Sequence, residues 1–147
     1  MTANVNIRKL LAKVPQFQSG SFEAIEATAA CFGLREVTAN ESVLSIGSPG
    51  DALFFILAGD FEAHLANDQV ITMKPGDFFG EIGLLLGVQR TSSVTARTDG
   101  SLLVLPGEHL SRILNVFPRL KKDMEKKARA RAPELMQKIG DAAGTQP

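Results

Sequence analysis

The sequence predicts an α+β fold: an antiparallel, jelly-roll-like β-barrel with N-terminal helices, a short helix inside the barrel region and C-terminal lid helices. Apolar residues recur at helical spacing before Leu34 and again after Glu108. Between these positions the period changes to two, and turn residues interrupt the chain roughly every 8–12 residues, as in sandwiches and jelly rolls. At 147 residues the chain fits one domain.

Two short helices are expected at the N-terminal end of the chain. The first covers Val5–Val14 and ends at Pro15, because the residue before a proline disfavours helical geometry. The second begins after Ser21, a suitable N-cap, and Gly33 stops it. Its inner face is expected to carry Phe22, Ile25, Ala29 and Phe32.

The middle of the chain reads as a series of short strands. The alternating runs are Leu34–Thr38, Ser42–Ile46, Leu53–Ala58, Phe61–Leu65, Gln69–Met73, Ser92–Ala96 and Leu102–Leu105. Glycine, proline, asparagine and aspartate occupy the breaks between them, which is turn chemistry. Asn67-Asp68, between two alternating runs, predicts a hairpin.

Helices return near the C-terminal end. The first covers Glu108–Val116, and Pro118 suits the first turn of the next. One face of that helix carries a stripe at intervals of three and four residues, formed by Leu120, Met124, Ala128, Arg131 and Leu135. Pro133 is expected to kink or restart the helix near Ala132. The chain therefore divides into a helical segment (1–33), a barrel (34–106), C-terminal helices (107–142) and a tail (143–147), within one domain overall.

Composition excludes several classes of function. Lys+Arg and Asp+Glu balance at 16 each, which argues against a broad nucleic-acid surface. No apolar run reaches about 18 residues, and the N-terminus has no signal-peptide core, so an intracellular location is expected. The single cysteine excludes an internal disulfide. A cupin-like metalloenzyme would need clustered histidines, but His64 and His109 are far apart, so no metal, cofactor or enzymatic activity is expected.

The segment Phe78–Ala96, called the cassette below, concentrates residues suited to a phosphate-bearing ligand. Gly80 and Gly83 let a ligand approach the main chain, and a helix starting near Glu81 presents free N–H groups to an anion. Arg90 offers a planar fork for bidentate phosphate pairing. Glu81 suits a sugar hydroxyl better than a phosphate, so the set favours phosphate plus ribose. The alternative to a binding site is that Arg90 is a solvated surface charge, Glu81 an acid at a helix N-terminus and Gly80 a turn residue.

In these motifs the chain resembles the cyclic nucleotide-binding domain family. The family's phosphate-binding motif reads phenylalanine, glycine, glutamate, an apolar residue, a small residue and leucine, and later an arginine followed by small or hydroxyl residues. The matching positions are Phe79, Gly80, Glu81, Ile82, Gly83, Leu84, Arg90, Thr91 and Ser92. The resemblance covers roughly Ile7 to Glu125 and includes Gly47-Ser48-Pro49-Gly50-Asp51 and Val14-Pro15-Gln16-Phe17.

The resemblance implies a cyclic nucleotide ligand, cAMP or cGMP, and a role for each matched residue. Arg90 would pair with the cyclic phosphate and Glu81 with the ribose 2′-hydroxyl, while Gly80, Ile82 and Gly83 offer backbone contacts. Thr91 and Ser92 would add hydroxyl and N–H donors. Thr91 either meets a guanine base, or it simply bonds the phosphate or packs in its strand, which leaves the base preference open. Gln89 stands where the family often has proline, and Gly83 where alanine is usual.

The C-terminal helix suggests which kind of protein uses the domain. In this family that helix closes over the base, so Arg131 and Leu135 are candidate ligand contacts, and the alternative is that the stripe packs permanently on the barrel. About a dozen residues follow Pro133, too few for a helix-turn-helix. NVNIRKLLAKVPQF and EKKARAR most resemble the regulatory domain of cyclic-nucleotide-gated or hyperpolarisation-activated potassium-type channels. This implies the cytoplasmic side of a membrane protein, contact with a membrane only through a parent channel or transporter, and possible oligomers. A kinase-type or stand-alone sensor and a ligand-independent interaction module are the alternatives.

Overall fold

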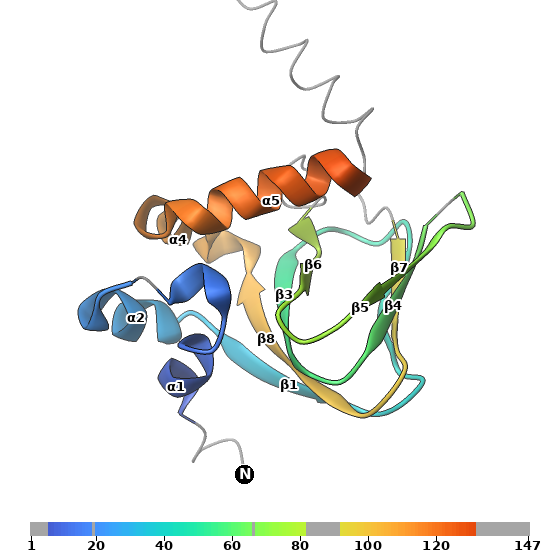
Figure 1. Cartoon of the computed structure of the whole chain (residues 1–147), viewed down its shortest axis with the longest axis horizontal. Helices are drawn as coiled ribbons and strands as arrows, with labels where there is room; N and C mark the ends of the chain where they lie inside the picture. Colours follow the sequence, from blue (N-terminus) through green and yellow to red (C-terminus); the bar gives the residue numbers. More distant parts are fainter. Residues whose placement is uncertain (1–5, 19, 66, 82–91, 132–147) are drawn as a thin grey trace, which may run out of the picture.

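The computed structural model describes residues 6–18, 20–65, 67–81 and 92–131. Its helices are α1 (Ile7–Leu11), η2 (Pro15–Phe17), α2 (Phe22–Ala29), η3 (Gly107–His109), α4 (Leu110–Val116) and α5 (Pro118–Arg131). Its strands are β1 (Gly33–Val37), β2 (Ser42–Leu44), β3 (Ala52–Ala58), β4 (Phe61–Leu65), β5 (Val70–Met73), β6 (Phe78–Phe79), β7 (Ser92–Ala96) and β8 (Gly100–Pro106). Helices gather at one end and strands at the other (Figure 1).

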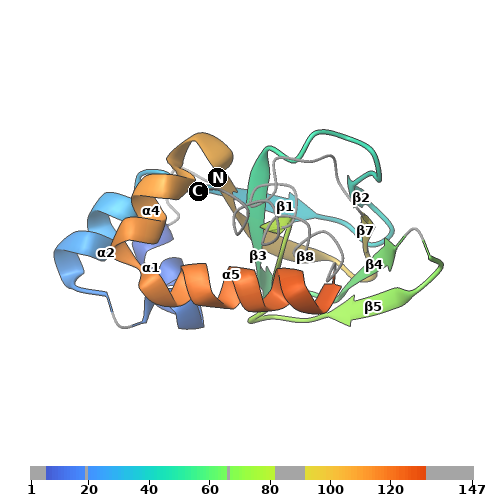
Figure 2. The same ribbon diagram turned by 90° about the horizontal axis from the view of Figure 1, so that it is seen from above.

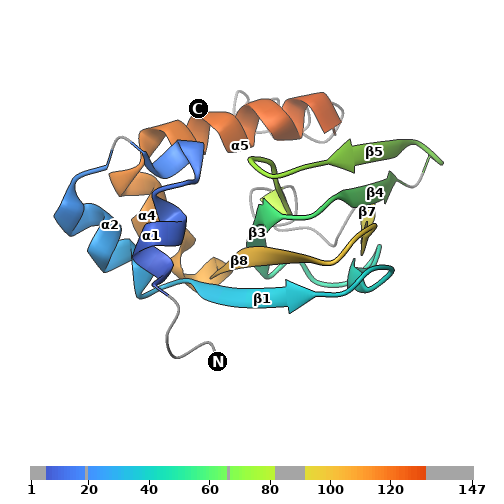
Figure 3. The ribbon, with the colours of Figure 1, turned by 60° about the horizontal axis from the view of Figure 1, so that its bottom comes forward.

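The strands form two antiparallel sheets of four strands each, in the orders β1-β8-β3-β6 and β2-β7-β4-β5. The sheets enclose a common interior (Figure 3). The predicted jelly-roll-like α+β fold is therefore confirmed. The Asn67-Asp68 hairpin is confirmed too: Asp68 takes φ 67°, and β4 pairs with β5 on either side of it.

Strands β3, β6 and β8 carry buried residues on both faces of their sheet, and these alternating side chains belong to two separate clusters. The inward residues join the barrel cluster, made of Val37, Leu44, Ala52, Phe54, Ile56, Phe61, Ala63, Met73, Phe79, Val94, Ala96 and Leu102. The outward residues join the helical cluster, made of Leu11, Val14, Phe17, Ile25, Phe32, Leu53, Phe55, Phe78, Leu103, Leu105, Leu110, Ile113, Phe117, Leu120 and Met124. A strand that alternates between two apolar environments reads as a continuous apolar run, as LFFIL in β3 does.

The N-terminal helices agree with the sequence in outline and differ in detail. Ser21 caps α2 as predicted, because its Oγ accepts the Ala24 N–H at 3.1 Å. The prediction that Phe22 faces inward was wrong: its side chain is 60% exposed, and the Arg8 guanidinium lies over its ring. The helix ends at Ala29, and Gly33 begins β1 instead of stopping the helix. The first helix is also shorter than predicted, Ile7–Leu11.

Helix α5 begins at Pro118, as predicted, and runs from the helical end across to the strands (Figure 2). Leu120, Met124 and Ala128 are fully buried on its inner face. Before it, Phe117 packs edge-on against Phe17, with ring centroids 4.8 Å apart. Hence the last described helix is held by residues of η2, about a hundred positions earlier in the chain.

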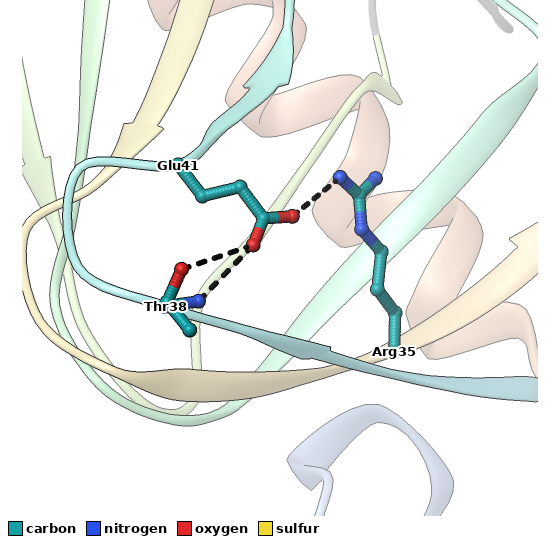
Figure 4. A network of polar contacts seen from close by, with 3 residues as sticks. All are labelled: Arg35, Thr38 and Glu41. Carbon is teal, nitrogen blue, oxygen red and sulfur yellow. Dashed lines mark hydrogen bonds and ion pairs between the residues drawn. The ribbon is translucent and has the colours of Figure 1, made fainter.

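The turn between β1 and β2 is closed by a polar network at the far end of the barrel (Figure 4). Glu41 accepts the Thr38 N–H at 3.1 Å and an Arg35 N–H at 3.0 Å. These contacts lower the pKa of the Glu41 carboxyl below its ordinary value, first through the Thr38 backbone bond and then through Arg35. Asn40 takes φ 72° here, a conformation that asparagine tolerates better than most residues.

Candidate functional site

The site is built around β6, a strand of two residues that the sequence analysis did not predict. Phe78 and Phe79 point to opposite faces, as neighbours in a strand must. Phe79 enters the barrel cluster and stacks on Phe54, with centroids 5.1 Å apart and planes 10° apart. Phe78 enters the helical cluster, 5.8 Å from Phe55. The cassette therefore begins where the two clusters meet.

Gly80 and Glu81 follow β6 directly and start the polar part of the site. Gly80 takes φ 94°, in the left-handed region where a side chain would be strained, so glycine is required at this turn. The backbone of Glu81 is helical, and its side chain is only 1% exposed. Carboxylates are seldom buried so fully unless they are paired or hydrogen-bonded, so Glu81 is a candidate for a binding or structural role.

The described part of the cassette resumes at Ser92, the first residue of β7. This strand belongs to the second sheet, and Ser92 lies opposite Leu65 of β4 in the register. Ser92 alternates in phase with Val94 and Ala96, which lie in the barrel cluster. The segment from Glu81 to Ser92 thus joins the edge of one sheet to the interior of the other.

Several predicted site residues lie outside the described residues: Ile82, Gly83, Arg90, Thr91 and Leu135, together with the side chain of Arg131. Their ligand contacts, and the expected kink near Pro133, stay predictions. The described members are Phe79, Gly80, Glu81 and Ser92, and the structure places all four at the two ends of one segment.

Helix α5 reaches the cassette from outside the barrel. Lys127 donates a hydrogen bond to the main-chain oxygen of Phe78, at 2.5 Å. The same ammonium lies 4.3 Å from the centre of the Phe78 ring. The helix that the sequence suggested as a lid thus touches the backbone two residues before Gly80.

A second set of polar contacts ties α5 to the N-terminal helices. The Gln16 amide donates to Asp123 at 2.9 Å, and the Arg119 guanidinium lies 3.6 Å from the same carboxylate. Arg119 also donates to the main-chain oxygen of Pro15. Gln16 is 6% exposed, and its Oε1 atom has no hydrogen-bond partner among the described residues. Consequently α5 is fixed at one end to η2 and further along to β6.

Sequence reasoning missed both of these connections. Lys127 stands beside Lys126 in a basic run, and nothing in the composition separates the two. Helical spacing distinguishes Lys127 from Lys126, because Lys127 follows Met124 by three positions and Leu120 by seven. This spacing places Lys127 at the edge of the buried stripe. Gln16 carried no comparable signal, since glutamine is mostly an exposed residue.

Other kinds of site find little support in the described part of the chain. Nowhere in it do three or more His, Cys, Asp or Glu side chains gather so that they could hold a metal ion. Of the helices in those ranges, none is both long enough and apolar enough to cross a membrane.

Known proteins resemble this chain in sequence and in fold. It is 31% identical over 120 residues to a cyclic nucleotide-gated potassium channel of Mesorhizobium japonicum, covering 82% of this chain and 33% of the channel. It is 26% identical over 122 residues to the mouse potassium/sodium hyperpolarization-activated cyclic nucleotide-gated channel 2, covering 83% of this chain and 14% of the channel. A structure of cAMP-bound PfPKA-R superposes with a TM-score of 0.75 at 20% identity, covering 90% of this chain and 46% of that one.

These relatives share one domain with this chain, which spans about a third or less of the two channels' length. The model of the cyclic nucleotide-binding domain family matches residues 34–116. That range includes the two sheets except for Gly33, and it includes the entire cassette. The chain therefore belongs to the cyclic nucleotide-binding domain family.

Proposed function

We propose that this domain binds a cyclic nucleotide, cAMP or cGMP, in the cassette and transmits occupancy through α5, as the regulatory domain of an ion channel or related transporter. The observation that carries the proposal is the buried carboxylate of Glu81, 1% exposed, in a segment that joins the two sheets. A buried acid next to a glycine turn suits a neutral hydroxyl donor, and a ribose 2′-hydroxyl is such a group.

The anionic part of the ligand needs a cation, and Arg90 supplies it in this proposal. Its planar guanidinium pairs with the two exocyclic oxygens of a cyclic phosphate. Gly80, Ile82 and Gly83 contribute backbone contacts, and Thr91 and Ser92 contribute hydroxyl and N–H donors. The hydroxyl of Thr91 also suits the guanine amino group, so both nucleotides are candidate ligands.

Transmission through α5 is supported by where the helix is attached. It contacts β6 through Lys127 and η2 through Asp123, so it spans the cassette and the N-terminal helices. A ligand shifts such an element only as far as its affinities for the two arrangements differ. Arg131 and Leu135 extend this helix toward the base in the proposal.

The parent protein is proposed by analogy with the channel relatives. A domain of this kind then lies on the cytoplasmic side of the membrane, reaches the membrane only through the parent, and is found in an oligomer if the parent forms one. Binding of nucleic acid and enzymatic activity are not part of the proposal. A kinase-type sensor is the second candidate, and its support is the fold shared with cAMP-bound PfPKA-R.

The test is thermal unfolding with cAMP, cGMP and the non-cyclic 5′-AMP. A ligand at a hundred times its Kd stabilises the folded state by about 2.7 kcal/mol, which raises Tm by several degrees in a domain of this size. We expect that rise with at least one cyclic nucleotide and a much smaller one with 5′-AMP. No rise with either cyclic nucleotide would favour a ligand-independent interaction module on the same fold.

A further inference from the structure

Among the basic residues of α5 whose side chains the structure describes, Lys127 stands apart in its burial. Its side chain is 19% exposed, whereas Lys121, Lys122, Lys126 and Arg129 all lie on the exposed surface of the helix. Burying a lysine costs side-chain entropy and hydration, so a contact must offset that loss. Lys127 therefore has a role that its neighbours do not share.

Three contacts of Lys127 involve two consecutive residues, Asp77 and Phe78, where the cassette begins. Its Nζ donates to the Phe78 oxygen at 2.5 Å, lies 4.3 Å from the Phe78 ring centre and lies 3.7 Å from Asp77 Oδ1. A charge-assisted hydrogen bond and a cation–π contact on one residue fix both its backbone and its ring. Phe78 is thus held from the α5 side as well as from β3.

Strand β6 is short enough for this support to matter. It has two residues, and in the described register it pairs with β3 alone, through Phe54 and Phe55. A two-residue edge strand has few ladder hydrogen bonds to define its position. Gly80, with φ 94°, and the buried Glu81 follow Phe78 closely in the chain. A displacement of the Phe78 backbone therefore reaches Glu81 within three residues.

We propose that Lys127 is a positioning residue of the cassette: by holding the Phe78 carbonyl and ring, it aligns Gly80 and Glu81 for the ligand. This inference rests on the proposed function, because it makes nucleotide affinity depend on the seating of α5 on β6. By linkage, a bound nucleotide stabilises the contact between α5 and β6 by the same factor by which that contact raises the nucleotide affinity. Lys127 touches no ligand in this arrangement and acts through Phe78.

Three variants of the whole chain test the proposal. Lys127→Met removes the charge and the donor but keeps a long apolar side chain, and Lys127→Arg keeps the charge and the donors. Lys126→Met is the matched control, because it makes the same substitution on the adjacent, exposed residue. The measurements are hydrogen–deuterium exchange of the Phe78–Glu81 amides without nucleotide, and the Kd for cAMP and cGMP by calorimetry at 10 °C.

We expect Lys127→Met to speed amide exchange in Phe78–Glu81 several-fold and to weaken nucleotide binding roughly three- to thirtyfold, as the loss of a partly exposed charge-assisted hydrogen bond implies. Lys127→Arg should recover most of both effects, and Lys126→Met should leave both unchanged. A Lys127→Met protein with a lower Tm but an unchanged Kd would overturn the positioning role, because it would make the lysine a structural anchor only.

Failure of this inference and failure of the proposed function give different results. If the unaltered domain bound neither cAMP nor cGMP, the proposed function would be wrong. Faster amide exchange in Lys127→Met than in Lys126→Met would then still support the inference that α5 holds the Phe78–Glu81 segment in place. Equal exchange in these two variants would overturn that inference whether or not a nucleotide binds.

Discussion

The two faces of the sheet β1-β8-β3-β6 are packed by different means. Among the described residues, the barrel cluster draws only on strands, between Val37 and Leu102. The helical cluster draws on both ends of the described chain, from Leu11 to Met124. The difference suggests a division of labour, in which the barrel cluster stabilises the barrel itself and the helical cluster connects the cassette to α5. Phe78 and Phe79, one in each cluster, are where the two meet.

The largest loss of stability is expected from Phe17→Ala in the helical cluster. Phe17 is fully buried, and its ring contacts Phe32, Phe55 and Phe117. Truncating such a phenylalanine costs about 3–5 kcal/mol of unfolding free energy, which urea denaturation measures. Because Phe117 precedes α5, the variant should also weaken nucleotide binding. An unchanged nucleotide Kd would show that packing in the helical cluster does not influence the binding site.

Leu102→Ala makes the corresponding change in the barrel cluster. Leu102 is fully buried on the inner face of β8, and the truncation costs about 2–5 kcal/mol. Its nucleotide Kd, measured on the folded protein, should stay within about twofold of the unaltered value, since no contact to α5 is lost. If Leu102→Ala weakened binding as much as Phe17→Ala, the proposed division between the clusters would not hold.

A smaller effect is expected from Gln16→Met, which removes the polar link between η2 and α5. The Gln16–Asp123 hydrogen bond of 2.9 Å is lost, but so is a buried amide oxygen that has no partner in the described part of the chain. These two consequences partly offset each other, so the unfolding free energy should fall by only about 1 kcal/mol. The control is Gln18→Met, an exposed glutamine two residues away. A loss above about 3 kcal/mol would mean that this link matters more than the apolar contacts around it.

The smallest effect concerns Glu41, whose contacts lie in the β1–β2 turn. Its pKa is lower in the folded state than the ordinary 4.5, so the ionised carboxylate stabilises the fold above that value. This contribution is lost as the pH falls through the lowered folded-state pKa. Denaturation of Glu41→Gln between pH 7 and pH 3 should show a slightly weaker acid dependence than the unaltered protein. Glu36→Gln controls for the removal of a nearby carboxylate, and identical acid dependence in Glu41→Gln and the unaltered protein would contradict this role.

Much of the fold could be predicted because its strands obey local rules. The alternation in Phe61–Leu65 and Ser92–Ala96, and the Asn67-Asp68 turn, identified strands that the structure confirms. Phe22 was misplaced because helical spacing alone does not reveal which side of a short helix faces the core. Strand β6 was missed because two residues are too few to show a period.

The candidate site divides in the same way. Gly80 and Glu81 were singled out from residue chemistry, but the left-handed turn and the burial of the acid come from the structure alone. The contacts of Lys127 with Phe78 and of Gln16 with Asp123 could not be predicted, because each pair is brought together by tertiary packing across 49 and 107 positions. The roles of Arg90, Thr91, Arg131 and Leu135 stay predictions.

The most direct test of the central claim is calorimetric titration of cAMP and cGMP into the unaltered domain and into Arg90→Ala. The loss of the charge that faces the cyclic phosphate should weaken binding by roughly 2–5 kcal/mol, about one and a half to three and a half decades in Kd, with Tm unchanged. Arg97→Ala, which alters an exposed arginine after β7, should bind normally. If folded Arg90→Ala bound nucleotide with the unaltered affinity, the cassette would not be the phosphate site and the account would be wrong.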